Sequence, residues 1–366
     1  LKSQFLLKCP IAYGVQIHQM ACDHLNQFVI LLTLIQNSLN RLRALLVCHV
    51  SSEIGIGHLS RLLALAETLR KDNNVIPEFL IFGDLIKQDE LADFNVYAFS
   101  LADDFVATIE NILKINNFDV VIFDLYPKHS IDNLGELFIQ LKQRKVRLIS
   151  IDSLIEYCNI LDIIWIPSFN FDCSRYTNCT SVLKSGWDSF LIQKRLQHKD
   201  WTPGIKVLIL TGGSDVVNLG ETLPMQLDEL LVKSTDVHWV RGPFSGSPNL
   251  PKKCRLNWIV HNAPERLDEL IVQSDYVMTV FGVSFFEVLQ YGIPTVVFSP
   301  YGNKNNNELD ALSEEEVAMS VYNPKLAIEG LIELMNNDGL AKEYSMNALK
   351  KMSINGVQNL SNEIYS

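Results

Sequence analysis

The 366-residue chain contains no long apolar run and no sign of a secretory leader. Its strongest apolar stretch, residues 28–35, is far shorter than the roughly 18 residues that indicate a membrane span. No clear small-residue cleavage site accompanies that stretch. We therefore expect no stable membrane insertion.

Cysteines are few and scattered, and none forms a C-x-x-C pair. Their odd number favours a reduced, cytoplasmic location and disfavours a structural zinc site. Cys173 and Cys179 are the pair that an oxidising compartment would join, and we expect them to stay reduced. The seven cysteines are Cys9, Cys22, Cys48, Cys158, Cys173, Cys179 and Cys254.

An excess of basic residues is also missing. The formal net charge of −11 argues against a nucleic-acid partner, because general nucleic-acid binders carry a basic face. No Asp-x-Asp run follows a predicted strand and no His or Cys cluster has metal-ligand spacing, so we expect neither a metal ion nor a cofactor. A small anionic ligand is compatible with this charge, since a local glycine loop can outweigh a distant net charge.

What the chain does have is a regular alternation of strands and helices. Short strands that are apolar on both faces and separated by helical patterns predict parallel sheets with covered faces. In the first half, strands are expected at 44–50, 78–82, 96–99, 120–123, 147–151 and 163–166, and helices at 58–71, 103–116 and 131–144. In the second half, strands are expected at 206–210, 237–240, 256–260, 276–280 and 295–298, and helices at 219–233, 263–273, 284–291, 325–336 and 340–352.

Length and pattern together predict an α/β fold with two Rossmann-type αβα domains that face each other across a cleft. We expect the first domain at 44–185, the interdomain connection at 186–204 and the second domain at 205–366. Residues 1–43 lack the strand–helix rhythm and form an N-terminal extension. It has a helical pattern at 25–42, and we assign it no function.

The most informative motif joins the first strand to the first helix. Gly55 and Gly57 open a loop that presents backbone N–H groups and a positive helix end to an anion. His58 can move a proton near neutral pH, and Arg61 suits a phosphate group. Ser60 occupies the place of the third glycine in the dinucleotide fingerprint, so the motif departs from that pattern. A tight turn with an exposed histidine and arginine is the alternative interpretation.

Two loops of the second half have a similar character. Gly212, Gly213 and Ser214 directly follow a predicted strand and form a candidate phosphate cradle. A plain turn between strand and helix is the alternative there.

The other loop contains Gly282 and Ser284, which bring N–H groups to a helix start where a diphosphate can bind. Glu287 lies one helical turn further, where its carboxylate can accept hydrogen bonds from ribose hydroxyls. Ser284 and Glu287 also have the Ser-x-x-Glu spacing of a capping box, and the two interpretations are compatible.

Asp124 and Tyr126 follow the strand at 120–123. Site residues collect at the carboxyl ends of parallel strands, so both are candidates for the active site. Asp152 holds the same position after the strand at 147–151. An aspartate that caps a turn is an equally open interpretation for either carboxylate.

Together these motifs resemble the UDP-sugar hydrolases of pseudaminic acid biosynthesis, which act on a UDP-linked diacetamido-trideoxy-altrose. The resemblance covers residues 44 to about 322. The chain departs from that family at Leu125, where some members have histidine, in the bulkier loop at 281–284, and in residues 1–43. More widely it resembles metal-independent glycosyltransferases of the GT-B kind, including the N-acetylglucosaminyltransferase that makes lipid II. The matching parts are 51–58 with Arg61, 122–126, 149–152, 211–215 with Asn218 and Leu219, 284–289 and the region of Asn303.

The resemblance implies a GT-B-like fold with a UDP-sugar between the domains. It implies that His58 polarises or deprotonates the attacking water, with Asp124 and Tyr126 as further catalytic residues. The bond between sugar C1 and the diphosphate then breaks and UDP leaves. The residues implied to hold the substrate are Gly55, Gly57, Arg61, Gly212, Gly213, Ser214, Gly282, Ser284, Glu287 and Asn303.

Three functions stay open at this point. The first is a UDP-sugar hydrolase in nonulosonic-acid or surface-polysaccharide biosynthesis. The second is a metal-independent GT-B glycosyltransferase that passes the sugar to an acceptor, although the acidic sequence shows no basic, apolar patch suited to a lipid acceptor. The third is a non-catalytic nucleotide-sugar binding module, which the presence of His58 and both glycine loops disfavours.

Overall fold

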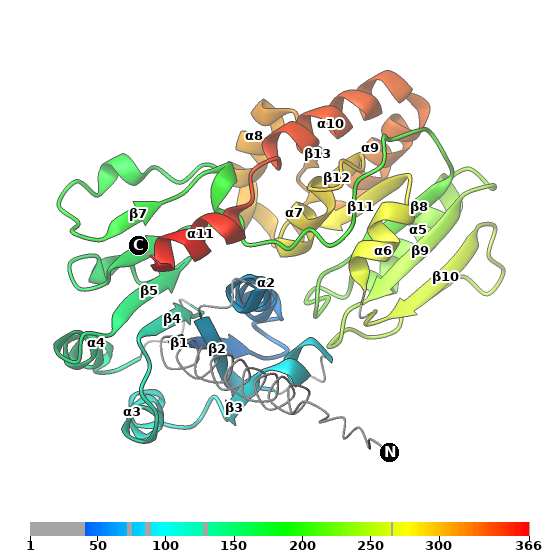
Figure 1. Ribbon diagram of the computed structural model, residues 1–366. Coiled ribbons are helices and arrows are strands. Elements are labelled where there is room, and N and C mark those ends of the chain that lie inside the picture. Colours follow the sequence, from blue (N-terminus) through cyan, green and yellow to red (C-terminus); the bar gives the residue numbers. More distant parts are fainter. Residues whose placement is uncertain (1–40, 72–74, 85–88, 127–130, 265, 366) are drawn as a thin grey trace, which may run out of the picture.

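The computed structural model describes residues 41–365 except 72–74, 85–88, 127–130 and 265 (Figure 1). The predicted helix at 25–42 lies almost entirely outside the described residues, as do Cys9 and Cys22. Its last residue, Leu42, begins a strand instead, because the apolar run that follows pairs with two neighbouring strands. The first strand therefore starts at residue 42 and not at 44.

The first half contains a parallel sheet with the strand order β3-β2-β1-β4-β5-β6-β7. The six predicted strands are all present. The order reverses beside β1, which puts the carboxyl ends of β1 and β4 side by side where ligands bind in such sheets. β7 is not predicted from the sequence, because its three residues are mostly exposed. The strands are β1 (Leu42–Val50), β2 (Val75–Gly83), β3 (Asn95–Phe99), β4 (Val120–Asp124), β5 (Arg147–Ile151), β6 (Ile163–Trp165) and β7 (Val182–Lys184).

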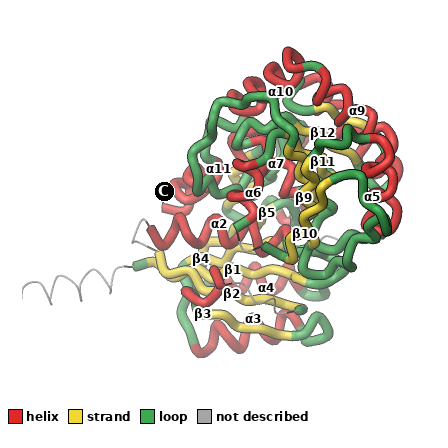
Figure 2. Tube along the Cα trace, turned by 90° about the vertical axis from the view of Figure 1, so that its right-hand side faces the viewer, coloured by secondary structure: helices red, strands yellow, loops and turns green. Residues whose placement is uncertain are grey.

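Helices cover both faces of this sheet. α2 (Gly57–Lys71) lies on the face toward the second half, and α3 (Phe105–Ile115) and α4 (Leu134–Gln143) lie on the other face (Figure 2). Neighbouring residues of β1 point to opposite faces of the sheet. Leu46 packs with the leucines of α2, and Leu45 packs with α3 and α4. This alternation confirms strands that are buried on both sides.

The second half repeats this architecture with the strand order β10-β9-β8-β11-β12-β13. The structure adds β13, which is short and partly exposed, and α8, whose polar sequence buries only Leu309 and Leu312. The elements are β8 (Lys206–Leu210), α5 (Leu219–Leu230), β9 (Asp236–Arg241), β10 (Asn257–Asn262), α6 (Leu267–Gln273), β11 (Tyr276–Val280), α7 (Val283–Leu289), β12 (Thr295–Phe298), α8 (Asn306–Glu315), β13 (Met319–Val321), α9 (Pro324–Asn336) and α10 (Asp338–Lys351). Short 3-10 helices are η1 (Asp89–Asp93), η2 (Ile155–Tyr157), η3 (Cys173–Arg175), η4 (Trp187–Ser189) and η5 (Gly302–Asn305).

The last helix, α11 (Gly356–Tyr365), crosses back to the first half and packs on α2 (Figure 1). Its Leu360 is fully buried in the apolar cluster that contains the leucines of α2. Arg147 at the start of β5 donates a hydrogen bond from Nη1 to the carbonyl of Ile364 at 3.1 Å. The end of the chain thus contributes to the packing of the first sheet, a return that the sequence does not predict. Among the described residues, no helix is both long and apolar enough to cross a membrane.

One expectation about the cysteines is wrong. Cys179 forms a disulfide, and its partner is Cys158, not Cys173. β7 lies beside β6, which brings the segment before β7 back to η2, and the Ser181 N–H donates to the carbonyl of Cys158 at 2.9 Å. Cys173 lies apart in η3, with its Sγ 3.1 Å from Ser185 Oγ.

We expect Leu360→Ala to lower the free energy of unfolding by about 2–4 kcal/mol, because it leaves a cavity between α11 and α2. Met346→Ala on α10 is the matched control. Its side chain is 60% exposed, so the change should stay below about 0.5 kcal/mol. Urea unfolding measures both, and equal effects would mean that α11 is not part of the core.

Candidate functional site

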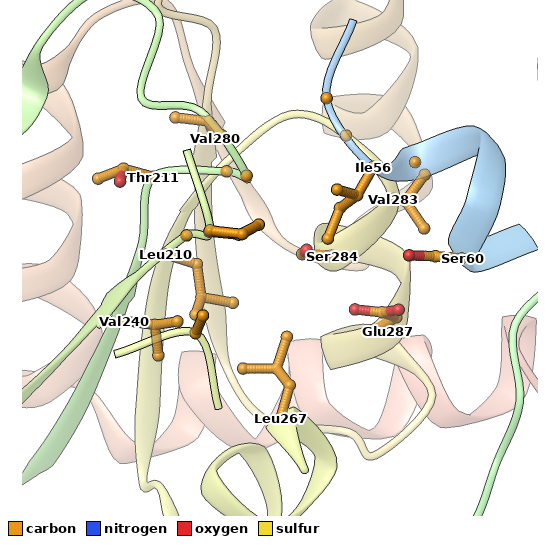
Figure 3. A pocket seen from close by; sticks show the side chains of 18 of the residues that line it. Ile56, Ser60, Leu210, Thr211, Val240, Leu267, Val280, Val283, Ser284 and Glu287 are labelled. Atoms are coloured by element: carbon orange, nitrogen blue, oxygen red, sulfur yellow. The ribbon is translucent and has the colours of Figure 1, made fainter. Parts of the chain in front are cut away.

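A cavity of about 530 Å³ lies between the carboxyl ends of the two sheets. Its volume is typical of small-molecule sites, and its position is where ligands bind in open α/β sheets. In Figure 3, Leu210, Val240 and Leu267 of the second half line one side of the cavity, and Ile56 and Ser60 of the first half lie opposite. Both halves therefore contribute to the site.

The first glycine loop forms at the predicted strand-to-helix turn. β1 ends at Val50, and α2 begins at Gly57. Between them, the Gly55 N–H donates to the carbonyl of Ser51 at 2.7 Å, and the φ of Gly55 is +82°, a left-handed value that favours glycine. This turn puts Gly55 and Gly57 on the cavity wall.

The glycine loops of the two halves meet across the cavity. Ile56 lies 3.4 Å from the point where a Cβ on Gly213 would be, and Val283 lies 3.2 Å from the corresponding point on Gly57. Gly212, Gly282 and Gly213 also line the cavity. A side chain at position 57 or 213 would therefore press on the opposite half.

Two hydroxyl groups of the second glycine loop are buried without a partner. Thr211 Oγ1 and Ser214 Oγ make no hydrogen bond to any residue that the structure describes. Both residues line the cavity. Because a buried hydroxyl without a partner costs free energy, a ligand with many hydrogen-bonding atoms is their natural complement.

Arg241 is a cavity residue that the sequence analysis missed. It ends β9, and its Nε donates to the carbonyl of Ser245 at 2.7 Å. No carboxylate among the described residues forms an ion pair with it, whereas the other two arginines of the cavity are paired. Its guanidinium charge is therefore available to an anionic ligand. A signal was present in the sequence, because Arg241 directly follows a predicted strand.

Glu287 lines the cavity from α7. Burial raises its pKa to about 7, and the neighbouring carboxylates of Glu90 and Asp268 add to the rise. Arg195 and a hydrogen bond with Ser284 oppose it. A carboxylate with this pKa changes its charge near neutral pH.

The capping-box interpretation of this helix is not supported. α7 begins at Val283, and Gly282 is its N-cap. Ser284 thus lies inside the helix, where its side chain interacts with Glu287. Both side chains belong to the cavity wall and not to a helix cap.

A second polar cluster lies at the adjoining ends of β4 and α2. His58 Nδ1 is 2.6 Å from Asp124 Oδ1, and its ring meets Tyr126 edge-on at 6.4 Å between centroids. Asp124 is fully buried. Burial alone would raise the pKa of Asp124, but Arg61 and His58 hold it below its usual value. Because an ionised carboxylate only accepts, Nδ1 of His58 carries the proton in this hydrogen bond.

This cluster borders the cavity but does not form its wall. His58 lies on α2 between two residues that line the cavity, Gly57 and Ser60. Across the cleft, burial is the main cause of a raised pKa of Tyr301, and Tyr126 contributes to it. Since Tyr301 lines the cavity, the cluster and the second half face each other there.

The structure places two predicted ligand contacts away from the cavity. Arg61 is buried, and its guanidinium is bound by Asp124 and Asp152. Asn303 is exposed in η5, whereas Tyr301 of the preceding loop lines the cavity. Adjacency in a motif therefore does not decide which side chain lines the cavity.

No family model matches the chain. The chain is similar to an uncharacterized protein of Methanocaldococcus jannaschii, at 29% identity over 286 residues. That match covers 70% of this chain and 55% of the other protein, so the chain spans about half the length of the curated relative that it matches.

Three solved structures share the arrangement of the two halves. MurG of Acinetobacter baumannii has a TM-score of 0.59 at 14% identity and covers 88% of this chain and 99% of its own. MnaA of S. aureus with UDP has a TM-score of 0.57 at 11% identity, with coverage of 88% and 96%. The calicheamicin glycosyltransferase CalG4 has a TM-score of 0.57 at 11% identity, with coverage of 89% and 98%. At these identities the similarity concerns the fold, and the predicted α/β fold of the GT-B kind is confirmed.

We expect Gly242→Ala to destabilise the protein by about 1–3 kcal/mol, as overpacking of a filled site does. A Cβ at this position would lie 2.4 Å from the carbonyl oxygen of Gly213 and would displace the second glycine loop. Gly246→Ala in the same segment is the control, because a Cβ there meets no atom within 4 Å. Thermal unfolding compares the two, and a neutral Gly242→Ala would contradict the close packing of the loops.

Proposed function

We propose that this chain is a GT-B enzyme that binds a UDP-sugar in the cavity and transfers the sugar to a hydroxyl acceptor. The observation that carries the proposal is a cavity between two glycine loops, with unpaired hydroxyls on Thr211 and Ser214 and the His58–Asp124 pair beside it. Among proteins of this fold, MnaA of S. aureus was solved with UDP, and CalG4 is a glycosyltransferase.

The diphosphate of the donor is proposed to bind at the second glycine loop. Backbone N–H groups of such a loop, the Ser214 hydroxyl and the Arg241 guanidinium are donors that suit phosphate oxygens. They also stabilise the negative charge that develops on UDP as the bond to the sugar breaks. The unpaired charge of Arg241 supports this assignment.

The nucleoside is proposed to bind at the wall of the second half. Leu210, Val240 and Leu267 supply an apolar surface for the flat base. Glu287 is the acceptor for ribose hydroxyls, and it accepts best when its carboxylate is ionised.

In the chemical step, the acceptor oxygen forms a bond to sugar C1 while the bond from C1 to the diphosphate oxygen breaks. The electron pair of the broken bond leaves with UDP. The acceptor proton moves to Nε2 of His58, and the Asp124 carboxylate on Nδ1 stabilises the imidazolium that results. In this proposal, His58 supplies the base, and the donors of the second glycine loop stabilise UDP as it leaves.

Hydrolysis is the second candidate, in which water takes the place of the acceptor hydroxyl. It is favoured by the run at 51–58 with Arg61, which resembles the UDP-sugar hydrolases of pseudaminic acid biosynthesis. The same base and the same leaving group serve both reactions. UDP release with and without an acceptor separates them.

We expect His58→Ala to lower kcat for UDP release by about 10²–10⁴-fold, the usual contribution of a general base. The substrates are UDP-glucose, UDP-galactose and UDP-N-acetylglucosamine, each with and without hydroxyl acceptors such as nitrophenyl glycosides. UDP affinity, measured by calorimetry, should stay within about twofold because UDP lies on the other half. His198→Ala, an exposed histidine of the connection, is the control and should behave like wild type. A folded His58→Ala protein with near wild-type kcat would end the assignment.

We expect Glu287→Gln and Glu287→Ala to weaken UDP binding by about 1.5–3 kcal/mol at pH 8, where the carboxylate is ionised. Because the pKa of Glu287 is about 7, wild type loses this advantage as the pH falls through 7. The ratio of variant to wild-type Kd should therefore shrink toward pH 6. The titration of UDP itself cancels in this ratio. A ratio that is large but constant with pH would contradict the role of the ionised carboxylate.

A further inference from the structure

Arg61 is held by two strand ends at once. Its Nε and Nη2 donate to the two oxygens of Asp124 at 3.0 and 2.7 Å, and its Nη1 donates to Asp152 Oδ2 at 2.9 Å. Asp124 ends β4, and Asp152 follows β5. Every nitrogen of the guanidinium is therefore committed to a carboxylate, and Arg61 itself is only 9% exposed.

These contacts use three of the five N–H groups of the guanidinium, and the Arg61 side chain does not line the cavity. Moving Arg61 toward the cavity would break a bidentate pair and leave a fully buried carboxylate without its cation, which costs several kcal/mol in proteins. A ligand would have to supply at least that much. Arg61 is thus unsuited to the phosphate role that its sequence position suggests.

Its charge acts on the base instead. Arg61 Nη2 lies 3.4 Å from His58 Nδ1, and both groups share the same oxygen, Asp124 Oδ1. An imidazolium at His58 would gain from the negative charge of Asp124 and lose from the positive charge of Arg61. Among the described residues, His58 contacts the charged or titratable groups of Asp124, Arg61 and Tyr126, and Asp152 lies beyond Arg61.

We infer that Arg61 is a positioning residue: it fixes the Asp124 carboxylate against His58 Nδ1 and offsets part of the negative charge of that carboxylate. This inference rests on the proposed function for its catalytic meaning. Without Arg61, the lone carboxylate would hold the proton on His58 to higher pH. Fewer molecules would then carry a base that can accept the acceptor proton.

The test compares Arg61→Gln, which removes the charge, with Arg61→Lys, which keeps the charge and loses the bidentate geometry. Arg70→Gln on the same helix is the control, because Arg70 forms an exposed ion pair with Asp93. We expect the acidic limb of the pH profile for UDP release to move up by about one pH unit in Arg61→Gln and to move less in Arg61→Lys. Arg70→Gln should leave the limb in place.

A second measurement does not need turnover. NMR titration of protein labelled at histidine follows His58 directly, with its signal assigned by its loss in His58→Asn. We expect the midpoint to move up by about one pH unit in Arg61→Gln. Because this measurement needs no substrate, it can succeed even if the proposed function is wrong, and the two failures can be told apart. If Arg61→Gln does not fold, Arg61→Lys is measured in its place, and a smaller upward shift is expected. A limb and a midpoint that coincide with wild type, with activity lost only in proportion to the folded fraction, would overturn the inference.

Discussion

The site depends on one buried carboxylate. Asp124 has no exposed surface, yet the Arg61 guanidinium and His58 hold its pKa below the usual value. From the end of β4, Asp124 binds His58 and Arg61, which both lie on α2. It therefore fixes the orientation of that helix on the first sheet. α11, at the other end of the chain, packs its apolar side chains against the same helix. His58 and the glycine loop before it, which lines the cavity, therefore depend on this carboxylate for their position.

The second constraint is the close approach of the two halves. Ile56 packs against Gly213, and Val283 packs against Gly57. Each half therefore packs an aliphatic side chain against a glycine of the other half. This contact leaves the unpaired hydroxyls of the second loop and the charge of Arg241 facing the cavity. A diphosphate would complement these groups, and a nucleobase would complement the apolar wall at Leu210 and Val240. The cavity wall therefore combines polar groups with apolar side chains.

Much of the fold could be predicted from the sequence, and the reason is physical. Strands buried on both faces produce continuous apolar runs, so the central strands can be predicted. β7 and β13 are three-residue strands that are at most partly buried, and α8 has a polar sequence that buries two leucines, so these elements give no such signal. The glycine loops were visible because turns need glycine locally. The partners of Arg61 cannot be predicted in this way, because they lie 63 and 91 residues away and only the folded sheet brings them together. The disulfide between Cys158 and Cys179 cannot be predicted for the same reason, because the pairing of β6 and β7 brings these two cysteines together.

The central claim is that one cavity holds UDP with its diphosphate on the second half and its leaving oxygen toward His58. A crystal structure of the protein with UDP tests it most directly. The account predicts phosphate oxygens within hydrogen-bond distance of Ser214 Oγ and the Arg241 guanidinium, ribose hydroxyls at Glu287, and the terminal phosphate on the side of His58 Nε2. UDP bound elsewhere, or bound here with its terminal phosphate turned away from His58, would contradict it.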